Sequence, residues 1–486
     1  MSSWSAFLRD KIFIDGMWID ADSGSTISVT DPATGDRLGT IPNAGAAETR
    51  RAIEAAGRAF KTFSALTAHE RATMLRDLAT AIMDNEAALA ELLTREQGKP
   101  LAESRGEVAM SAAYIQWFAE EARRVYGDTI PSPWRDRRIM VTKQPIGVVG
   151  AITPWNFPSS MLARKIGPAL AAGCTVVAKP ASQTPYSALA WGILAEQVGI
   201  PNGVLNIVTG DARAVGGELT SNPEVKKITF TGSTAVGKIL MKQAADTVKK
   251  VSMELGGNAP FIVFDDADIE RAVDGAMAAK FRNAGQTCVC TNRIYAQSGI
   301  HDRFVEALCE ATRKLVVGSG LEPGISTGPL IDENAVAKVE QFLDDAIAKG
   351  GNVVVGGKRH ALGGLFFEPT VITGATAQME FARDEIFGPL APVFRFDTEK
   401  DVIALANDTE FGLAAYFYTK DLGRAFRVSE ALEYGIVGIN EGIVTTEVAP
   451  FGGFKESGTG REGSKYGLTD YLEEKYVCIG GLGNPD

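Results

Sequence analysis

Between residues 146 and 255, short apolar runs alternate with segments of helical spacing. The runs IGVVGAI, CTVVAKP, VLNIVTG and KKITFTG are followed by helical patterns that begin near residues 159, 184, 215 and 233. Continuous apolar runs of this length, separated by helices, are typical of parallel strands covered on both faces. The pattern predicts an α/β fold with a parallel sheet, and a ligand site at the carboxyl ends of its strands.

The chain before this region contains hairpin and helix signals. Residues 11–42 alternate short β-like runs with turns, which indicates hairpins. The stretch from Thr67 to Glu70 spells a capping box, and apolar residues at helical spacing follow it. A further helix is expected over residues 103–124.

The chain after this region predicts a second α/β lobe over residues 258–440. Its clearest helix covers residues 334–349, with apolar side chains on one face and Gly350 as the stop signal. The last forty residues combine a glycine-rich loop with a β-like run, YLEEKYVCIG.

Composition and charge limit the classes of partner and the cell compartment that we expect for the chain. A length of 486 residues suggests two or three lobes, and the formal net charge of −11 without a basic block argues against nucleic acid or an anionic membrane as the main partner. The apolar runs are far shorter than a membrane span, and the N-terminal segment does not resemble a signal peptide. Five cysteines without framework spacing fit reduced thiols, so a cytoplasmic protein is expected.

Two of the five cysteines, Cys288 and Cys290, lie together in GQTCVC. Metal binding is poorly supported because no Cys or His cluster completes a tetrahedral site, and we expect no metal. Buried packing is one interpretation, since free cysteine is commonly buried. The other is a nucleophile, which must reach the thiolate from a free pKa of about 8.5.

Two polar residues in stiff or apolar surroundings are candidates for catalysis. Glu254 in VSMELGG follows apolar neighbours, so desolvation would raise its pKa and make it a proton acceptor; an exposed strand-end glutamate is the alternative. Asn156 lies between two prolines in TPWNFPSS, where a fixed amide could hold an oxyanion or simply form a turn.

Two loops are candidates for binding a nucleotide. Residues 232–238 nearly spell a phosphate loop, but Ile239 lacks the hydroxyl that would hold Mg²⁺, which leaves an anion seat at Ser233 or plain strand–turn–helix packing. Lys179 ends an apolar run and Ser182 follows in a loop without an acidic residue. Such a loop favours NADP over NAD, unless Lys179 is an ordinary surface lysine.

Seven motifs occur in order along the chain: PWNFP, AKPAS, FTGS, MELGG, GQTC, DEIFGP and APFGG followed by FKESG. Together they resemble the aldehyde dehydrogenase superfamily essentially from end to end. The surroundings FPSSMLARKIGPALAAGC and KFRNAGQTCVCTNR are similar to the succinate-semialdehyde dehydrogenases within it.

The resemblance implies a catalytic mechanism. Cys288 would attack the aldehyde carbon, and Asn156 with the Cys288 N–H would hold the oxyanion of the thiohemiacetal. After hydride transfer to the nicotinamide, Glu254 would activate the water that hydrolyses the thioester. NADP is the expected cofactor, with NAD as the second choice. The implied cofactor contacts are Trp155, Asn156, Lys179, Ser182, Gly232, Ser233, Leu255, Glu385 and Phe387.

The resemblance also implies a small carboxylated aldehyde as the substrate. Arg164 and Arg282 would grip its carboxylate, and Thr445 and Thr446 stand where the family often has a serine contact. Succinate semialdehyde is the expected substrate and glutarate semialdehyde the nearest alternative. Acyl transfer to coenzyme A and a non-catalytic scaffold are further alternatives, which the presence of Glu254 and Cys288 disfavours. In some relatives the second cysteine, here Cys290, forms a reversible disulfide with the first; an inert thiol is the other interpretation.

The architecture implied by the resemblance has three parts. They are a cofactor-binding domain of residues 1–122 and 143–254, a catalytic domain of residues 255–445, and a small β extension of residues 123–142 and 446–486. The extension would reach a neighbouring subunit, so a homodimer or homotetramer is expected.

Overall fold

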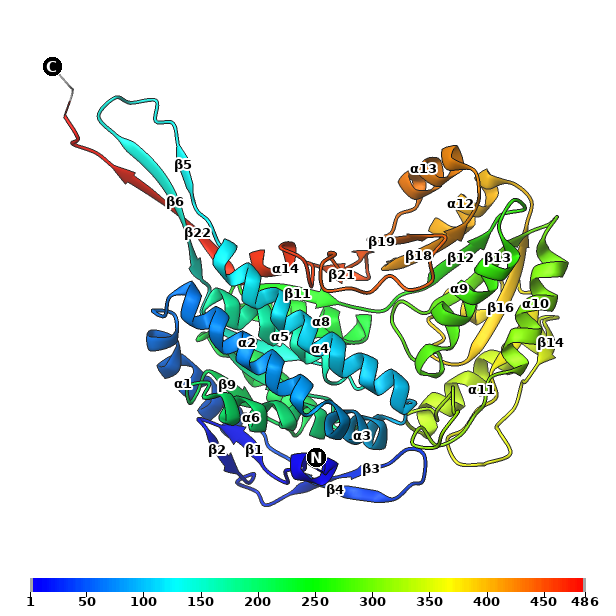
Figure 1. The fold of residues 1–486 in the computed structure, drawn as a ribbon, viewed down its shortest axis with the longest axis horizontal. Helices are drawn as coiled ribbons and strands as arrows, with labels where there is room; N and C mark the ends of the chain where they lie inside the picture. Colours follow the sequence, from blue (N-terminus) through cyan, green and yellow to red (C-terminus); the bar gives the residue numbers. More distant parts are fainter. Residues whose placement is uncertain (1–2, 484–486) are drawn as a thin grey trace.

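Two α/β lobes and a projecting β arm make up the molecule (Figure 1). The structure is a computed structural model that describes residues 3–483. Residues 1–2 and 484–486, at the two ends of the predicted domains, lie outside the described residues.

The first lobe is built on an eight-stranded sheet. Five neighbouring strands, β9, β8, β7, β10 and β11, run parallel, which confirms the predicted parallel sheet, while β2, β1 and β21 complete its edges with antiparallel pairings. In spatial order the strands are β2 (Met17–Ile19), β1 (Ile12–Ile14), β9 (Leu205–Ile207), β8 (Thr175–Lys179), β7 (Val148–Ile152), β10 (Val225–Thr231), β11 (Lys250–Glu254) and β21 (Gly458–Thr459).

Helices cover both faces of this sheet. The crossover helices are α5 (Ser160–Ala172), α6 (Tyr186–Val198), α7 (Ala212–Ser221) and α8 (Thr234–Ala245), each starting within a few residues of its predicted position. The N-terminal helices are α1 (Ala46–Phe63), α2 (Ala68–Asp84), α3 (Glu86–Gln97) and α4 (Leu101–Glu121), the last followed by a 3₁₀ turn (Ala122–Arg124). The capping box is confirmed: Glu70 N–H donates to Thr67 Oγ1 at 3.2 Å, and Thr67 N–H donates to Glu70 Oε2 at 2.7 Å.

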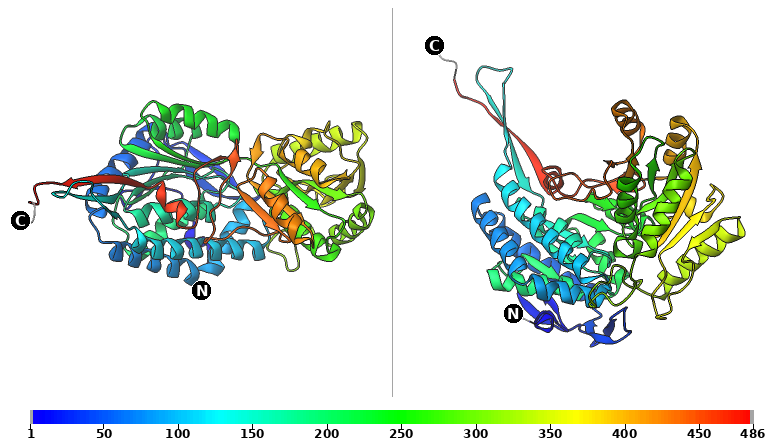
Figure 2. Two further views of the ribbon diagram at one scale, coloured as in Figure 1. Left: turned by 90° about the horizontal axis from the view of Figure 1, so that it is seen from above. Right: turned by 45° about the vertical axis from the view of Figure 1, so that its right-hand side comes forward.

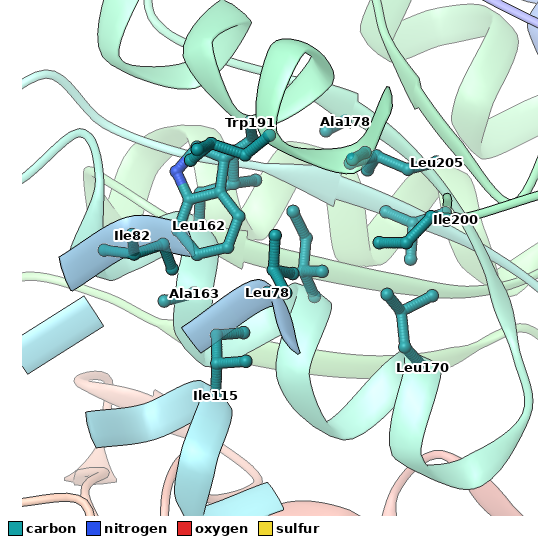
Figure 3. Packing of buried hydrophobic residues seen from close by; sticks show 14 of the residues in the cluster. Leu78, Ile82, Ile115, Leu162, Ala163, Leu170, Ala178, Trp191, Ile200 and Leu205 are labelled. Atoms are coloured by element: carbon teal, nitrogen blue, oxygen red, sulfur yellow. The ribbon is translucent and has the colours of Figure 1, made fainter. Parts of the chain in front are cut away.

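Helix α5 lies in the core between the sheet and helices α2 and α4 (Figure 3). Leu162 of α5 packs with Leu78 of α2, Ile115 of α4 and Trp191 of α6, and all are almost completely buried. Burying a large apolar side chain contributes roughly 1.5–3 kcal/mol. Every residue of α5 is buried, including Arg164, so the charge of that residue needs a partner or a function.

The second lobe contains a seven-stranded sheet that is parallel except for its edge strand β14. Its strands in spatial order are β14 (Asn352–Val355), β15 (Thr370–Thr373), β16 (Leu390–Phe396), β13 (Thr291–Gln297), β12 (Ala259–Val263), β18 (Ala414–Tyr418) and β19 (Ile436–Ile439). Its helices are α9 (Ile269–Phe281), α10 (His301–Arg313), α11 (Glu333–Ala348), α12 (Glu399–Asn407) and α13 (Leu422–Ala431). Helix α11 is the one predicted over residues 334–349, and Gly350 follows it with a φ of 88°.

The arm is a three-stranded antiparallel sheet that extends away from both lobes (Figure 2). Its central strand β6 (Arg138–Pro145) pairs with β5 (Asp128–Ile130) and β22 (Leu472–Ile479). The C-terminal stretch is shared, because β21 joins the first sheet beside β11 whereas β22 joins the arm. The domain boundaries stay a prediction.

Three smaller elements complete the chain. They are a hairpin of β3 (Thr26–Thr30) and β4 (Arg37–Pro42), a pairing of β17 (Phe411–Gly412) with β20 (Phe454–Lys455), and the short helix α14 (Tyr466–Thr469). Among residues 3–483, none of the helices is long and apolar enough to span a bilayer.

Candidate active site

A cavity of about 200 Å³ lies between helices α4 and α5 of the first lobe and the segment that precedes β13 of the second. Four residues predicted to handle substrate meet in its wall: Cys288, Arg164, Arg282 and Thr445. Apolar side chains, including Met110, Phe157 and Phe451, make up much of the remaining wall. Small, largely apolar cavities with a few converging polar groups are typical of active sites.

The Cys288 thiol is partly exposed in this cavity. Burial raises its pKa to about 12, and the nearby carboxylates of Glu385 and Glu254 act in the same direction. The guanidinium groups of Arg164 and Arg282 oppose them. Without a further positive charge or a base, the sulfur is therefore a neutral thiol near pH 7.

A strained turn presents Cys288 to the cavity. Asn283, Ala284 and Gly285 have φ angles of 51°, 53° and 76°, so three successive residues adopt the left-handed conformation. For the two non-glycine residues this costs on the order of 1–3 kcal/mol each. The Asn283 amide stabilises the turn by donating to Gln286 O at 3.2 Å and accepting from Gln97 Nε2 at 3.0 Å. Strain held in place by such bonds is typical of a functional loop.

The side chain of Asn156 is fixed against this turn. Its Nδ2 donates to Gln286 O at 3.0 Å, so one hydrogen is bound and the second stays available. Its backbone oxygen accepts from Lys99 Nζ at 2.7 Å and from Asn283 Nδ2 at 3.1 Å. Because hydrogen bonds fix both the side chain and the backbone of this buried residue, its amide can act as a preorganised donor to an oxyanion.

Glu254 ends strand β11 with its side chain fully inside the protein. Neither carboxylate oxygen has a hydrogen-bond partner among the described residues. Burial raises the pKa of Glu254 well above its usual range, Glu462 reinforces this effect, and Lys165 and Arg164 oppose it. A carboxylate with a raised pKa and free oxygens can accept a proton near neutral pH.

Arg164 is stacked between two aromatic rings, with its guanidinium carbon 4.8 Å from the Tyr114 ring centre and 4.6 Å from that of Phe451. Its Nη1 lies 3.8 Å from Glu462 Oε2, yet Nε and Nη1 make no hydrogen bond within the described part of the chain. Buried and unbonded N–H groups are costly unless a ligand satisfies them. The guanidinium of Arg164, which lines the cavity, is therefore suited to a carboxylate.

The other predicted substrate contacts differ in position. Arg282 lies over the Phe157 ring at 5.5 Å and shares the cavity wall with Glu103, whose Oε2 accepts from the Asn283 N–H at 2.9 Å. Thr446 is not among the wall residues that the structure describes: its backbone oxygen accepts from the Tyr114 hydroxyl at 3.2 Å.

The carboxyl ends of the first sheet present groups that fit a dinucleotide. Lys179 ends β8 buried, and its ammonium donates to Pro180 O at 3.2 Å. Ser233 caps α8 by accepting from the Val236 N–H at 3.4 Å, so the first turn of that helix faces the strand ends with its N–H groups. A Cβ on Gly232 would lie 2.4 Å from the Phe230 ring, so only glycine fits beside this turn. Cationic and N–H donors of this kind suit phosphate groups.

The remaining predicted cofactor contacts lie at the junction of the lobes. Trp155 and Phe387 form an edge-on ring pair with centroids 5.5 Å apart. Glu385 Oε1 accepts from the Gly257 N–H at 3.2 Å, and burial raises the pKa of Glu385 to about 7. A carboxylate here fits a ribose hydroxyl. Leu255 is buried against the start of α8, and Ser182 lies half-buried in the loop after β8.

Cys290 differs from Cys288 in being buried and bonded. Its S–H donates to Lys280 O at 3.0 Å, and both cysteines are free thiols. An inert thiol remains the favoured interpretation of Cys290, and the reversible disulfide remains the alternative hypothesis. Among residues 3–483 there is no group of three or more His, Cys, Asp or Glu side chains that could hold a metal.

Sequence reasoning missed the buried charged residues in and beside the cavity wall. Lys99 and Glu107 are completely buried and joined at 2.6 Å, and Lys165 is paired with Glu462 in the same way. The only signal in the sequence was the presence of charges in otherwise apolar segments, which an exposed helix face would also produce.

Comparison with known proteins identifies the family. Residues 18–477 match the model of the aldehyde dehydrogenase family. A glutarate-semialdehyde dehydrogenase of Pseudomonas aeruginosa is 62% identical over 98% of both chains, and the NADP(+) succinate-semialdehyde dehydrogenase GabD of Escherichia coli is 62% identical over 98% of this chain and 99% of its own. The crystal structure of an NADP-dependent enzyme from E. coli superposes with a TM-score of 0.97 at 62% identity, covering 98% of this chain and 99% of that one. The chain therefore belongs to the aldehyde dehydrogenase family, and it is an NAD(P)-dependent aldehyde dehydrogenase.

Proposed function

We propose that the protein oxidises a short aldehyde with a carboxylate at its far end, succinate semialdehyde, to the dicarboxylic acid, with NADP as the preferred acceptor. The observation that carries this proposal is the Arg164 guanidinium: it lines the same small cavity as the Cys288 thiol, and its Nε and Nη1 have no hydrogen-bond partner among the described residues. A carboxylate bound in this cavity would accept hydrogen bonds from the Arg164 guanidinium, and Arg282 in the same wall adds a second positive charge.

In the first step, Cys288 Sγ loses its proton and attacks the aldehyde carbon, and the carbonyl π pair moves onto oxygen. The Asn156 amide and the Cys288 N–H donate to that oxyanion. The thiol proton passes to bulk water, and the positive charges of Arg164 and Arg282 favour the thiolate that remains. Covalent capture divides a difficult oxidation into two easier reactions.

The cofactor, when bound, supplies the nicotinamide that accepts the hydride of the aldehyde carbon. Trp155, Phe387 and Glu385 would hold the nicotinamide end, and Gly232 with Ser233 the pyrophosphate. Lys179, together with Ser182, would hold the adenosine ribose and its 2′-phosphate. The preference for NADP rests on the loop after β8, which contains a buried cation and no acidic residue.

In the final step Glu254 takes a proton from the water that attacks the thioester carbon. The carbon–sulfur bond breaks, the thiolate leaves, and the acid is released. Acyl transfer to coenzyme A would need no such base, so acyl-CoA formed in proportion to NADPH would contradict the proposal.

Glutarate semialdehyde is the second candidate substrate, because the relative from Pseudomonas aeruginosa carries that name at the same identity. The test compares kcat/KM for aldehydes of three to six carbons, with and without the far carboxylate, using NADP and NAD. The proposal expects the four-carbon acidic aldehyde with NADP to have the highest value. A higher value for the five-carbon acid would select glutarate semialdehyde, and equal values for propanal would contradict a carboxylate clamp.

A dimer or tetramer is proposed from the arm. Among the described residues, the outer strands β5 and β22 each pair on one side only, and exposed strand edges are usually covered by a partner. Sedimentation of the intact chain distinguishes monomer, dimer and tetramer.

A further inference from the structure

Helices α3 and α4 are joined by a short connection that contains Lys99. The side chain of Lys99 is 1% exposed, although lysine is almost never buried to this extent without a partner. Its ammonium donates to Glu107 Oε2 at 2.6 Å and to Asn156 O at 2.7 Å, and it lies 3.7 Å from the centre of the Phe157 ring. Burying this charge is costly, and three directed contacts offset the cost.

The connection reaches the loop of Asn156 and the nucleophile turn together. Gln97 donates to Asn283 Oδ1 at 3.0 Å and accepts from the Lys99 N–H at 3.0 Å. Asn283 in turn donates to Asn156 O at 3.1 Å. The oxygen of Asn156 is thus held from two directions, by Lys99 of the first lobe and by Asn283 of the turn before Cys288.

The partner of Lys99 extends the same support to helix α5. Glu107 Oε1 accepts the backbone N–H groups of Ser159 and Ser160, at 2.9 and 3.1 Å, so its carboxylate caps the first turn of α5. Four residues further on, α5 carries Arg164. The ion pair of Lys99 and Glu107 therefore touches the loop of Asn156 and the helix of the carboxylate clamp.

We infer that Lys99 is a positioning residue: it fixes the backbone of Asn156 so that the amide of that residue meets the oxyanion on the Cys288 adduct. The inference rests on the proposed role of Asn156. A donor to an oxyanion contributes fully only when it already points at the place where charge develops, because reorienting it would consume part of the gain. Lys99 is not among the described wall residues of the cavity, although its partners Glu107 and Phe157 are, and its direct contact with a proposed catalytic residue is the bond to Asn156 O.

A double-mutant cycle of Lys99→Met and Asn156→Ala tests this dependence. The readout is the rate constant of the NADPH burst, with the active enzyme counted by titration of Cys288. Because only active sites are counted, a loss of folded protein does not change this value. We expect Asn156→Ala to slow the burst by about 100-fold or more, as loss of one oxyanion donor does elsewhere. Lys99→Met alone should slow it by roughly 10- to 50-fold, and in the Asn156→Ala background by less than about twofold.

Lys249→Met is the matched control. Lys249 is also buried and donates to two backbone oxygens, of Asn222 and Val225, at the opposite end of β11 from Glu254. It should lower thermal stability without changing the burst rate constant per site. If Lys99→Met alone does not fold because Glu107 keeps an unpaired charge, the cycle is measured with Glu107→Gln in all members, since glutamine still offers an oxygen to the two N–H groups.

The outcomes distinguish the positioning role of Lys99 from the oxyanion role of Asn156. An equal fold-loss from Lys99→Met in both backgrounds, or no loss in the single variant, overturns the positioning inference and leaves the oxyanion role of Asn156 intact. A parent burst rate in Asn156→Ala removes that oxyanion role, and the inference with it.

Discussion

Around the cavity, the same residue type occurs in two opposite conditions. Glu107 is buried with both oxygens bonded, to Lys99 and to the start of α5. Glu254 is equally buried, but neither of its oxygens is bonded to a residue that the structure describes. The cysteines repeat the contrast, because Cys290 donates its S–H to a carbonyl while Cys288 opens into the cavity.

The arginines give a third pair. Arg293 is as buried as Arg164, but its guanidinium donates to the backbone oxygens of Asn258, Leu405 and Ala406. In Arg164, Nε and Nη1 have no hydrogen-bond partner among residues 3–483. Arg164 and Glu254 both lie close enough to Cys288 to influence its pKa. Because unsatisfied buried polar groups are costly, those of Arg164 and Glu254 are candidates for binding groups that arrive from outside the protein. The bonded members of the pairs support the backbone instead.

The largest expected effect separates the two cysteines. Cys288→Ala should lower NADPH formation by at least about 10⁴-fold, because the covalent route is lost. Cys290→Ala should keep the rate within about threefold under reducing conditions, since its sulfur is buried and bonded away from the cavity. Steady-state absorbance at 340 nm measures both. Comparable losses in the two variants would show that Cys290 also contributes to the reaction.

The second effect separates the two glutamates. Glu254→Gln should reduce steady-state turnover by about 10²- to 10⁴-fold while an initial burst of NADPH persists, because hydrolysis of the thioester loses its base. In the parent, turnover should fall as pH drops through the raised pKa of Glu254, since the protonated acid accepts no proton. Stopped-flow traces and the pH profile of kcat report these two results.

The matched variant for this pair is Glu107→Gln. It should slow the burst and lower the thermal stability. Hydrolysis of the thioester should stay faster than the burst. An acyl enzyme that accumulates in Glu107→Gln but not in Glu254→Gln would reverse the two assignments.

The sequence predicted the two lobes and several residues of the cavity, but not the buried contacts that support them. The alternation of strands and helices predicted both lobes, and the motifs around Cys288 and Arg164 predicted residues that the structure brings to one cavity. The hydrogen bonds that support the cavity residues were not predictable. The contact of Lys99 with Asn156 joins residues 57 apart, and that of Gln97 with Asn283 joins residues 186 apart. Such contacts depend on how the lobes pack, which no local pattern encodes.

A third effect concerns the resting thiol. The pKa of Cys288 is raised to about 12, so between pH 7 and 9 its thiolate fraction should rise about tenfold per pH unit. Labelling by iodoacetamide without cofactor should therefore accelerate by about 100-fold over this range. Mass spectrometry of the peptides should find Cys290 unlabelled. A labelling rate that levels off below pH 9 would mean that the arginines outweigh burial.

The smallest effect separates the two arginines. Arg164→Met should raise KM for succinate semialdehyde by roughly 10- to 100-fold, because a charge-assisted hydrogen bond contributes about 1.5–3 kcal/mol. For propanal, which has no carboxylate, KM should change by less than about threefold. Methionine keeps the apolar stem between the rings of Tyr114 and Phe451, so packing is largely retained.

Arg293→Met supplies the control for that change. It leaves several buried carbonyl groups without donors, so the free energy of unfolding should fall by about 3 kcal/mol, while the ratio of KM values for the two aldehydes stays at the parent value. Denaturant titration and initial rates measure the two quantities. If Arg164→Met shifted both KM values equally, Arg164 would be a packing residue like Arg293, and its unbonded N–H groups would not identify the site of the carboxylate. If only the acidic aldehyde responds, the incompletely bonded guanidinium marks the position of a substrate group that no described side chain replaces.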